Sequence, residues 1–283
     1  MYYYYYRRGI LFSLTIGIIA LLSFLGLTSN ITTSSSNDDS LSLLQQRLLR
    51  RNLLSEGVDG SNTVTKQKQN NNNIMLKMYF GVGCFWHIQH EFIVRGERTI
   101  LGRNNDNEIT SKAGYAGSTN VGSDGRVCYH NFKGIADYGT LGHAEVVQFS
   151  LPLIEVQNFT RLYFSLFDPT TGDRVDPQDR GAEYRSVIGL PGGNSSNLFR
   201  AAIESVANET GYTLQSGVGS DPDTLGTKLV YVYDSNKFPF HQAEVFMQFR
   251  DDFQSPPYGP VYNRLVESAL DDGRIIGQGC PEN

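Results

Sequence analysis

The sequence is poor in cysteine. Of its 283 residues only Cys84, Cys128 and Cys280 carry a thiol, and they lie far apart along the chain. Three scattered cysteines do not make a disulfide framework, and none belongs to the C-x-x-C pair of zinc or thioredoxin-like sites. The lack of a close pair also argues against a thiol–disulfide isomerase. We therefore expect cysteine to be reactive rather than structural here.

The chain also lacks an excess of positive charge. Its 24 Lys and Arg residues face 29 Asp and Glu residues, which gives a formal net charge of -5. Without a basic surface the attraction to phosphate is weak, so we expect no nucleic acid partner. His87 and His90 are three residues apart and could share a helix face. No thiolate or carboxylate set completes a ligand shell around them, so we expect no metal.

Only one long apolar run is present, and it lies near the N-terminus. Residues 10–27 are uncharged and follow Arg7 and Arg8. At about 1.5 Å per residue this run nearly spans a bilayer core. Residues 1–29 are therefore predicted to be a signal peptide or a signal anchor, with the arginines on the cytoplasmic side. We expect a membrane-associated or secretory protein, and an organelle destination also fits.

A polar segment separates this run from the rest of the chain. Residues 30–73 are rich in Ser, Thr and Asn and contain too little apolar surface to form a core. We predict a disordered stalk. Within it, residues 41–54 have leucines at helical spacing with arginines between them, which favours a short amphipathic helix on a membrane or a partner.

Regular hydrophobic patterning begins at residue 74, so residues 74–283 are predicted to be one folded domain. The tail 254–283 is predicted to add a helix before Cys280. Strands alternate with helices, which predicts an α+β fold arranged as a two-layer α/β sandwich. The expected strands are 75–83, 143–151, 184–190 and 228–234, and the expected helices are 84–94, 153–167 and 195–211, the last capped by Ser and ended by Gly.

Cys84 lies where the first strand meets the first helix. Unpaired backbone N–H groups at a helix start favour an anion, so the thiol pKa is expected to be lowered and the thiolate to be a nucleophile. Phe85 and Trp86 could form an apolar wall beside it, and Glu145 could stay protonated if its carboxyl is partly buried. From the residues alone, core aromatics and an exposed strand-end carboxylate are the favoured interpretation.

Six motifs occur in an order that resembles the peptide-methionine (S)-S-oxide reductases, over about residues 75–241. This resemblance implies a ferredoxin-like core and the reduction of methionine (S)-sulfoxide, free or in oxidised proteins. It implies no cofactor, with reducing equivalents from thioredoxin or another dithiol. The motifs are GCFW (83–86), GYAG (114–117), GHAEVV (142–147), FDPTT (167–171), DRGAEYRSVI (179–188) and FHQAE (240–244).

The resemblance also assigns residue roles. Cys84 matches the nucleophile that becomes a sulfenic acid, and Glu145 matches the acid that protonates the sulfoxide oxygen. Asp179 and Tyr184 match groups that orient this oxygen. The implied substrate-binding residues are Gly83, Phe85, Trp86 and His143.

The implied resolving cysteine is Cys280, whose glycine-flanked tail would bring its thiol to Cys84 and form an intramolecular disulfide. Cys128 is the competitor: it could resolve, relay electrons or be a plain buried thiol. A second phenol of the family site is matched by Tyr129 or Tyr138, with Tyr129 preferred.

Four features depart from the family pattern. His87 replaces the usual glycine, Phe167 replaces the histidine that often precedes DPT, the segment 118–141 is long, and the tail 254–283 is unusual. The alternative to an enzyme is a membrane-tethered sulfoxide-binding or redox-sensing module, in which Cys84 is oxidised without turnover. The joint presence of an acid and oxygen-orienting groups beside the thiol favours the enzyme.

Overall fold

The computed structural model describes residues 74–281. The predicted leader, stalk and amphipathic segment lie outside the described residues. Within residues 74–281, none of the helices combines the length and the apolar character needed to cross a bilayer.

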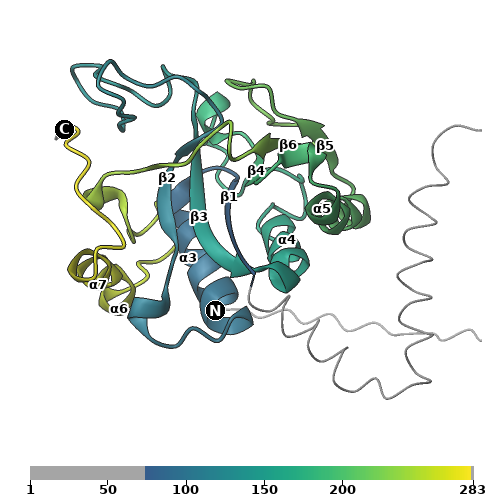
Figure 1. Cartoon of the computed structure of the whole chain (residues 1–283), viewed down its shortest axis with the longest axis horizontal. Coiled ribbons are helices and arrows are strands. Elements are labelled where there is room, and N and C mark those ends of the chain that lie inside the picture. The colour runs from purple at the N-terminus through teal and green to yellow at the C-terminus, as the bar shows by residue number, and fades with distance from the viewer. Residues whose placement is uncertain (1–73, 282–283) are drawn as a thin grey trace, which may run out of the picture. The chain divides into compact units, whose positions relative to one another are not determined.

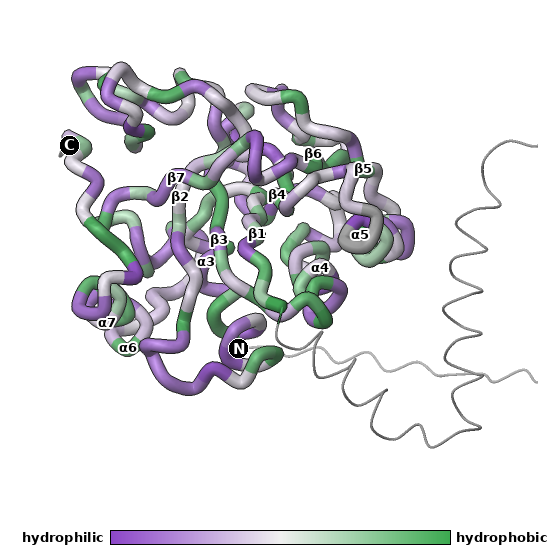
Figure 2. Tube along the Cα trace, in the orientation of Figure 1, coloured by the Kyte–Doolittle hydropathy of each residue, from purple (hydrophilic) through white to green (hydrophobic). Residues whose placement is uncertain are grey.

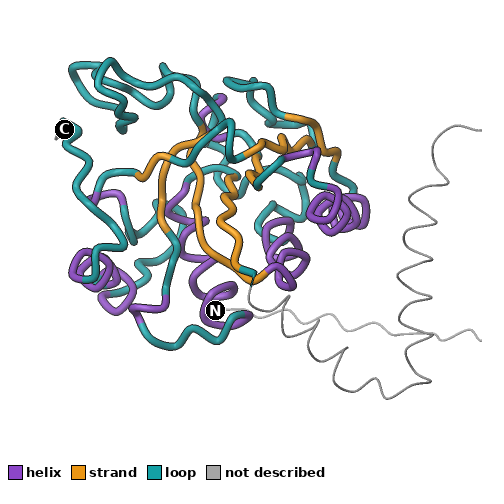
Figure 3. Tube along the Cα trace, viewed as in Figure 1, coloured by secondary structure: helices purple, strands orange, loops and turns teal. Residues whose placement is uncertain are grey.

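A seven-stranded mixed sheet runs through the domain in the order β5-β6-β4-β1-β3-β2-β7 (Figure 1). Its strands alternate with helices along the chain, so the fold is α+β as the sequence predicts (Figure 3). The strands are β1 (Met75–Gly81), β2 (Lys112–Ala116), β3 (Ala144–Pro152), β4 (Val187–Leu190), β5 (Thr213–Ser216), β6 (Leu229–Asp234) and β7 (His241–Gln242). The α-helices are α3 (Phe85–Glu91), α4 (Val156–Phe164), α5 (Asn197–Thr210), α6 (Pro260–Asn263) and α7 (Leu265–Asp271), and a π-helix, Phe92–Ile100, continues α3.

The central part of the sheet has the ferredoxin-like arrangement. The chain runs β1-α3-β2-β3-α4-β4, and the four strands lie in the order β4-β1-β3-β2. β1 pairs antiparallel with both β3 and β4, and β2 pairs antiparallel with β3. This is the split βαβ topology. The strands β6 and β5 extend it with parallel pairing beyond β4.

The two faces of the sheet bury different side chains, because side chains alternate along each strand. Phe80 of β1 and Phe149 of β3 belong to the main core, which also contains residues of α3, α4 and α5. Tyr79 and Val146 point to the opposite face and pack in a second cluster with Tyr233. Figure 2 shows that α4 carries both hydrophobic and hydrophilic residues.

The elements expected from the sequence are present, with local differences. β2, β5 and β7 were not predicted; each is short, and the burial of β2 comes from its neighbours rather than from an apolar pattern. The single helix predicted in the tail is two short helices, α6 and α7. Gly211 ends α5 with a φ of 78°, as predicted, but the Ser196 side chain makes no capping hydrogen bond.

The aromatic centre of the main core should carry much of the stability. The Phe149 ring centroid lies 4.7 Å from that of Phe92 and 5.0 Å from that of Phe159. Phe149→Ala is expected to lower the free energy of unfolding by about 3–5 kcal/mol, because it leaves a cavity that this packing cannot fill. Urea denaturation measures the change. Phe132, which is 100% exposed, is the matched control, and an equal loss in Phe132→Ala would contradict this packing.

Candidate active site

Cys84 follows the end of β1 and is the N-cap residue of α3. Its backbone N–H donates to Asp179 Oδ2 at 2.8 Å. Gly83 permits this approach: its φ is +74°, and a Cβ there would lie 2.6 Å from the same carboxylate oxygen. The Gly83 N–H donates to the Tyr184 carbonyl at 3.1 Å. These contacts bring Asp179 and Tyr184 to the thiol from a distant part of the chain.

Glu145 approaches the same place from β3. Its Oε2 accepts a hydrogen bond from the Phe85 N–H at 2.9 Å, and its Oε1 accepts one from the Tyr138 hydroxyl at 3.0 Å. The residue is only 2% exposed. Burial raises the pKa of Glu145 to about 8, against the two hydrogen bonds, which lower it. The carboxyl group is therefore mostly protonated at neutral pH.

The pKa of the Cys84 thiol is shifted in the direction opposite to the one expected. Burial raises the pKa of Cys84 far above its usual value, and the charge of Glu145 raises it further, while backbone N–H groups of α3 lower it. The prediction of a lowered thiol pKa was thus wrong, because desolvation outweighs the helix start at this position. The resting pair consists of a neutral thiol facing a neutral acid.

A single pocket contains most of the predicted site residues, including Cys84, Glu145, Asp179 and Tyr184. The predicted aromatics Phe85 and Trp86 form part of its wall, and the Trp86 ring N–H donates to the Met247 carbonyl at 3.0 Å. The complete lining is Val82, Cys84, Phe85, Trp86, His87, Tyr129, Glu145, Val175, Asp176, Asp179, Tyr184, Asp252, Phe253, Gln254 and Ser255. Reactive groups and apolar surface therefore share one cavity.

The lining residues that the sequence analysis did not assign to the site include the continuous segment 252–255. Phe253 lies edge-on to Trp86 with ring centroids 5.3 Å apart, although it is 84% exposed. His87 Nδ1 is 3.1 Å from Asp252 Oδ2 and so attaches this segment to α3. Across the pocket mouth, Gln254 donates to Asp176 at 3.0 Å. His87 and the first residues of the tail, Gln254 and Ser255, thus line the same pocket.

The two candidate phenols occupy different positions. Tyr129 lines the pocket, and burial together with the charge of Glu145 raises its pKa to about 12. Tyr138 is fully buried and donates to Glu145. Tyr129 therefore can face a bound substrate, and Tyr138 supports the acid.

His143 does not line the pocket, contrary to its assignment as a substrate-binding residue. Its Nε2 is 2.7 Å from the Asn120 carbonyl, and its ring lies edge-on to His241. Burial lowers the His143 pKa to about 4. Gly83 is likewise absent from the lining and acts through its backbone. The pair His87 and His90 is split between separate carboxylates, Asp252 and Glu91.

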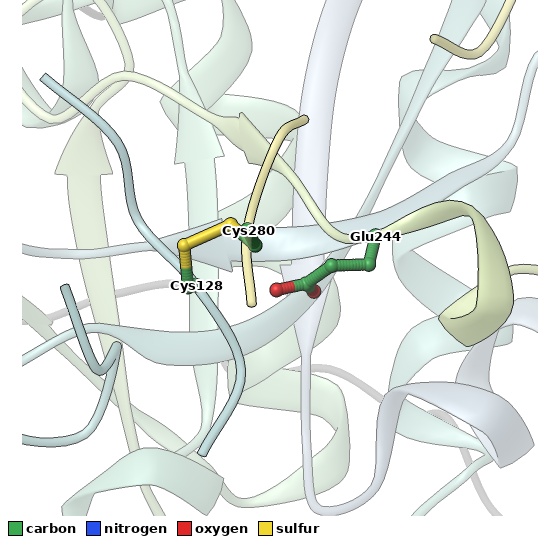
Figure 4. A group of neighbouring side chains, drawn as sticks. All are labelled: Cys128, Glu244 and Cys280. Atoms are coloured by element: carbon green, nitrogen blue, oxygen red, sulfur yellow. A yellow bond between two sulfur atoms is a disulfide. The ribbon is translucent and has the colours of Figure 1, made fainter. Parts of the chain in front are cut away.

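The cysteine pairing also differs from expectation. Cys128 and Cys280 form a disulfide with a Cα–Cα distance of 5.7 Å (Figure 4). Cys84 is free. The predicted bond between Cys280 and Cys84 is not the one present. The sequence contained no signal for this bridge, because 152 positions separate the two residues and only folding brings them together.

Because Cys84 is the free thiol, its alkylation reports on the acid beside it. At about pH 9 Glu145 is ionised and its charge raises the Cys84 pKa. Glu145→Gln should therefore speed alkylation of Cys84 at that pH, by roughly tenfold for each pKa unit removed. At about pH 6.5, where Glu145 is neutral, the two rates should agree. Mass spectrometry after iodoacetamide treatment measures both, with the exposed Glu209→Gln as the control; equal rates at pH 9 would refute the coupling.

Comparison with known proteins agrees with this geometry. The family model described as peptide methionine sulfoxide reductase matches residues 76–219, which is just over half of the 283-residue chain. The peptide methionine sulfoxide reductase MsrA of Geobacter sulfurreducens is 30% identical over 47% of this chain and 72% of its own length. That of Methanothermobacter thermautotrophicus is 33% identical over 46% of this chain and 64% of its own length.

Among solved structures, methionine sulfoxide reductase A of Corynebacterium diphtheriae is similar over 70% of this chain and 76% of its own length. The sequence identity is 16% and the TM-score is 0.38. The family match covers the segment that contains Cys84, Glu145, Asp179 and Tyr184. The chain is therefore an enzyme of the peptide methionine sulfoxide reductase family.

Proposed function

We propose that the chain reduces the (S) epimer of methionine sulfoxide, in oxidised proteins and as the free amino acid, with Cys84 as the nucleophile. The observation that carries this proposal is the buried neutral carboxyl of Glu145 in the same pocket as the only free thiol. A sulfoxide oxygen is a poor leaving group until it is protonated, and such an acid can supply the proton.

The pocket offers a place for each part of the substrate. Phe85 and Trp86 provide apolar surface for the methyl group, as the methyl is the least polar end of the sulfoxide. Tyr129 and Tyr184 line the same cavity and carry hydroxyl groups that can donate to the oxygen. This orientation turns the sulfur toward Cys84.

The proton balance of the reaction closes within the thiol and acid pair. Glu145 donates its proton to the sulfoxide oxygen while the sulfur of Cys84 attacks the substrate sulfur. The attack forms a bond between the two sulfurs, and the protonated oxygen then moves to the sulfur of Cys84 as the substrate S–O bond and the new S–S bond break. Methionine leaves, and Cys84 becomes a sulfenic acid. The thiol proton passes to Glu145 as the attack proceeds, so the step does not need a resting thiolate, whose formation the raised pKa of Cys84 disfavours.

Two further thiols complete the proposed cycle. Cys280 attacks the sulfenic acid, which releases water and leaves a disulfide with Cys84. Cys128 then attacks the sulfur of Cys280, which forms the observed Cys128–Cys280 bond and frees Cys84. Reduction of that bond by thioredoxin or another dithiol would return the chain to its starting state. No prosthetic group is needed.

The N-terminal segment supports a proposal on location. The apolar residues 10–27 after Arg7 and Arg8 would direct the chain to a membrane or the secretory pathway, and residues 30–73 would separate the enzyme from that membrane. Whether residues 1–29 are removed is decided by the N-terminal sequence of the protein from its natural cells.

The proposed activity is tested with separated epimers. The full chain and dithiothreitol are expected to consume methionine (S)-sulfoxide and to leave the (R) epimer unchanged, as followed by chromatography. Cys84→Ser should give no turnover, because the nucleophile is lost. Cys280→Ser should retain the first turnover and lose recycling by thioredoxin. Consumption of neither epimer would favour a sensor, and equal loss of the first turnover in both variants would contradict the division of roles.

A further inference from the structure

Glu244 places a second buried carboxyl group next to the disulfide (Figure 4). Its side chain is 5% exposed, and a carboxylate oxygen lies within 4.8 Å of the sulfurs of both Cys128 and Cys280. Neither the proposed sulfoxide chemistry at Cys84 nor the pocket uses this residue. Because a buried carboxyl is costly to keep in a fold, its position beside two reacting sulfurs requires an explanation.

Two hydrogen bonds fix the carboxyl group in place. Its Oε1 accepts a hydrogen bond from the Tyr129 N–H at 2.8 Å, and its Oε2 accepts one from the Tyr115 hydroxyl at 2.9 Å. Among the described residues, no Lys, Arg or His lies within 4.0 Å of it. Each oxygen retains a free lone pair, so the group can still accept a proton.

The two sulfurs differ in access, which sets the order of their reactions. Cys128 is fully buried, whereas Cys280 is only partly buried and directly follows the exposed Gly279. An external disulfide or dithiol therefore reaches Cys280 first. Cys128 reacts second, from a fully buried position, and burial disfavours the charged form of a thiol.

We propose that Glu244 is the general base that activates Cys128. The carboxylate takes the thiol proton as the sulfur of Cys128 attacks the sulfur of Cys280 in a mixed disulfide. The bond from Cys280 to its partner breaks, and the partner leaves as a thiolate while the Cys128–Cys280 bond forms. In the reverse direction, when a dithiol opens the bond, Glu244 returns the proton to Cys128 as it leaves.

A purely electrostatic role for Glu244 makes the opposite prediction. A charged carboxylate that acted only through its field would keep the neighbouring thiol protonated, and its removal would speed closure. A base that accepts the proton makes closure faster than it is without the carboxylate. The sign of the rate change therefore separates the two roles. The inference extends the proposed recycling, but its test needs no sulfoxide and so can fail independently of the enzyme activity.

The test uses the full chain with Cys84→Ser, so that only Cys128 and Cys280 can react. The reduced protein is mixed with glutathione disulfide, and samples quenched with acid are weighed by mass spectrometry. Cys280 should form a glutathione mixed disulfide that closes rapidly. With Glu244→Gln this intermediate should accumulate, and closure should slow by about 100-fold, the low end of general base catalysis. Glu244→Asp should close at an intermediate rate.

A matched control separates this chemistry from damage to the fold. Glu97 is also a buried carboxylate, held by Arg103 and by Ser111 at the opposite end of β2 from Tyr115. Glu97→Gln should close at the rate of the parent chain. Closure that is unchanged or faster in Glu244→Gln would overturn the proposal. An equal slowing in Glu97→Gln would also overturn it, because the effect would then belong to the fold.

Discussion

The burial of one carboxyl group, that of Glu145, determines most of what this molecule can do. Desolvation raises its pKa to about 8, so an acid that would ordinarily be ionised keeps its proton at neutral pH. The fold encloses this group on most sides. β3 carries Glu145, the Phe85 N–H and the Tyr138 hydroxyl donate to its two oxygens, and the pocket lies on the remaining side. Burial of Cys84 likewise keeps its thiol protonated at rest, so both groups carry a proton at neutral pH.

The two redox centres have different surroundings. Cys84 lies in the pocket with a neutral acid, while the Cys128–Cys280 disulfide lies beside the carboxyl of Glu244. Tyr115 connects the two regions: it donates to Glu244, and its ring stacks on Tyr138 with centroids 4.5 Å apart. Each centre thus has its own proton-transfer group. The stacked rings of Tyr115 and Tyr138 lie between the two carboxyl groups.

Local sequence was a good guide to the fold and to part of the site. The long strands and helices follow from hydrophobic periodicity, and the motif that contains Cys84, Phe85 and Trp86 placed the pocket correctly on the chain. Distances across the fold were not accessible in this way. Three findings depend on residues that are not neighbours in the chain: the contact of His87 with Asp252, the disulfide, and the position of His143 outside the pocket. The thiol pKa was mispredicted because a helix start is visible in sequence and the extent of burial is not.

The central claim, that a proton on Glu145 is required for attack by an un-ionised Cys84, is tested most directly by the pH dependence of the first turnover. The reduced full chain is mixed with a stoichiometric amount of methionine (S)-sulfoxide, and methionine is measured before any recycling. The rate should be highest below pH 8 and should fall as the pH rises through about 8, where Glu145 loses its proton. A rate that rises steadily across this range, as ionisation of the thiol alone would produce, would contradict the claim.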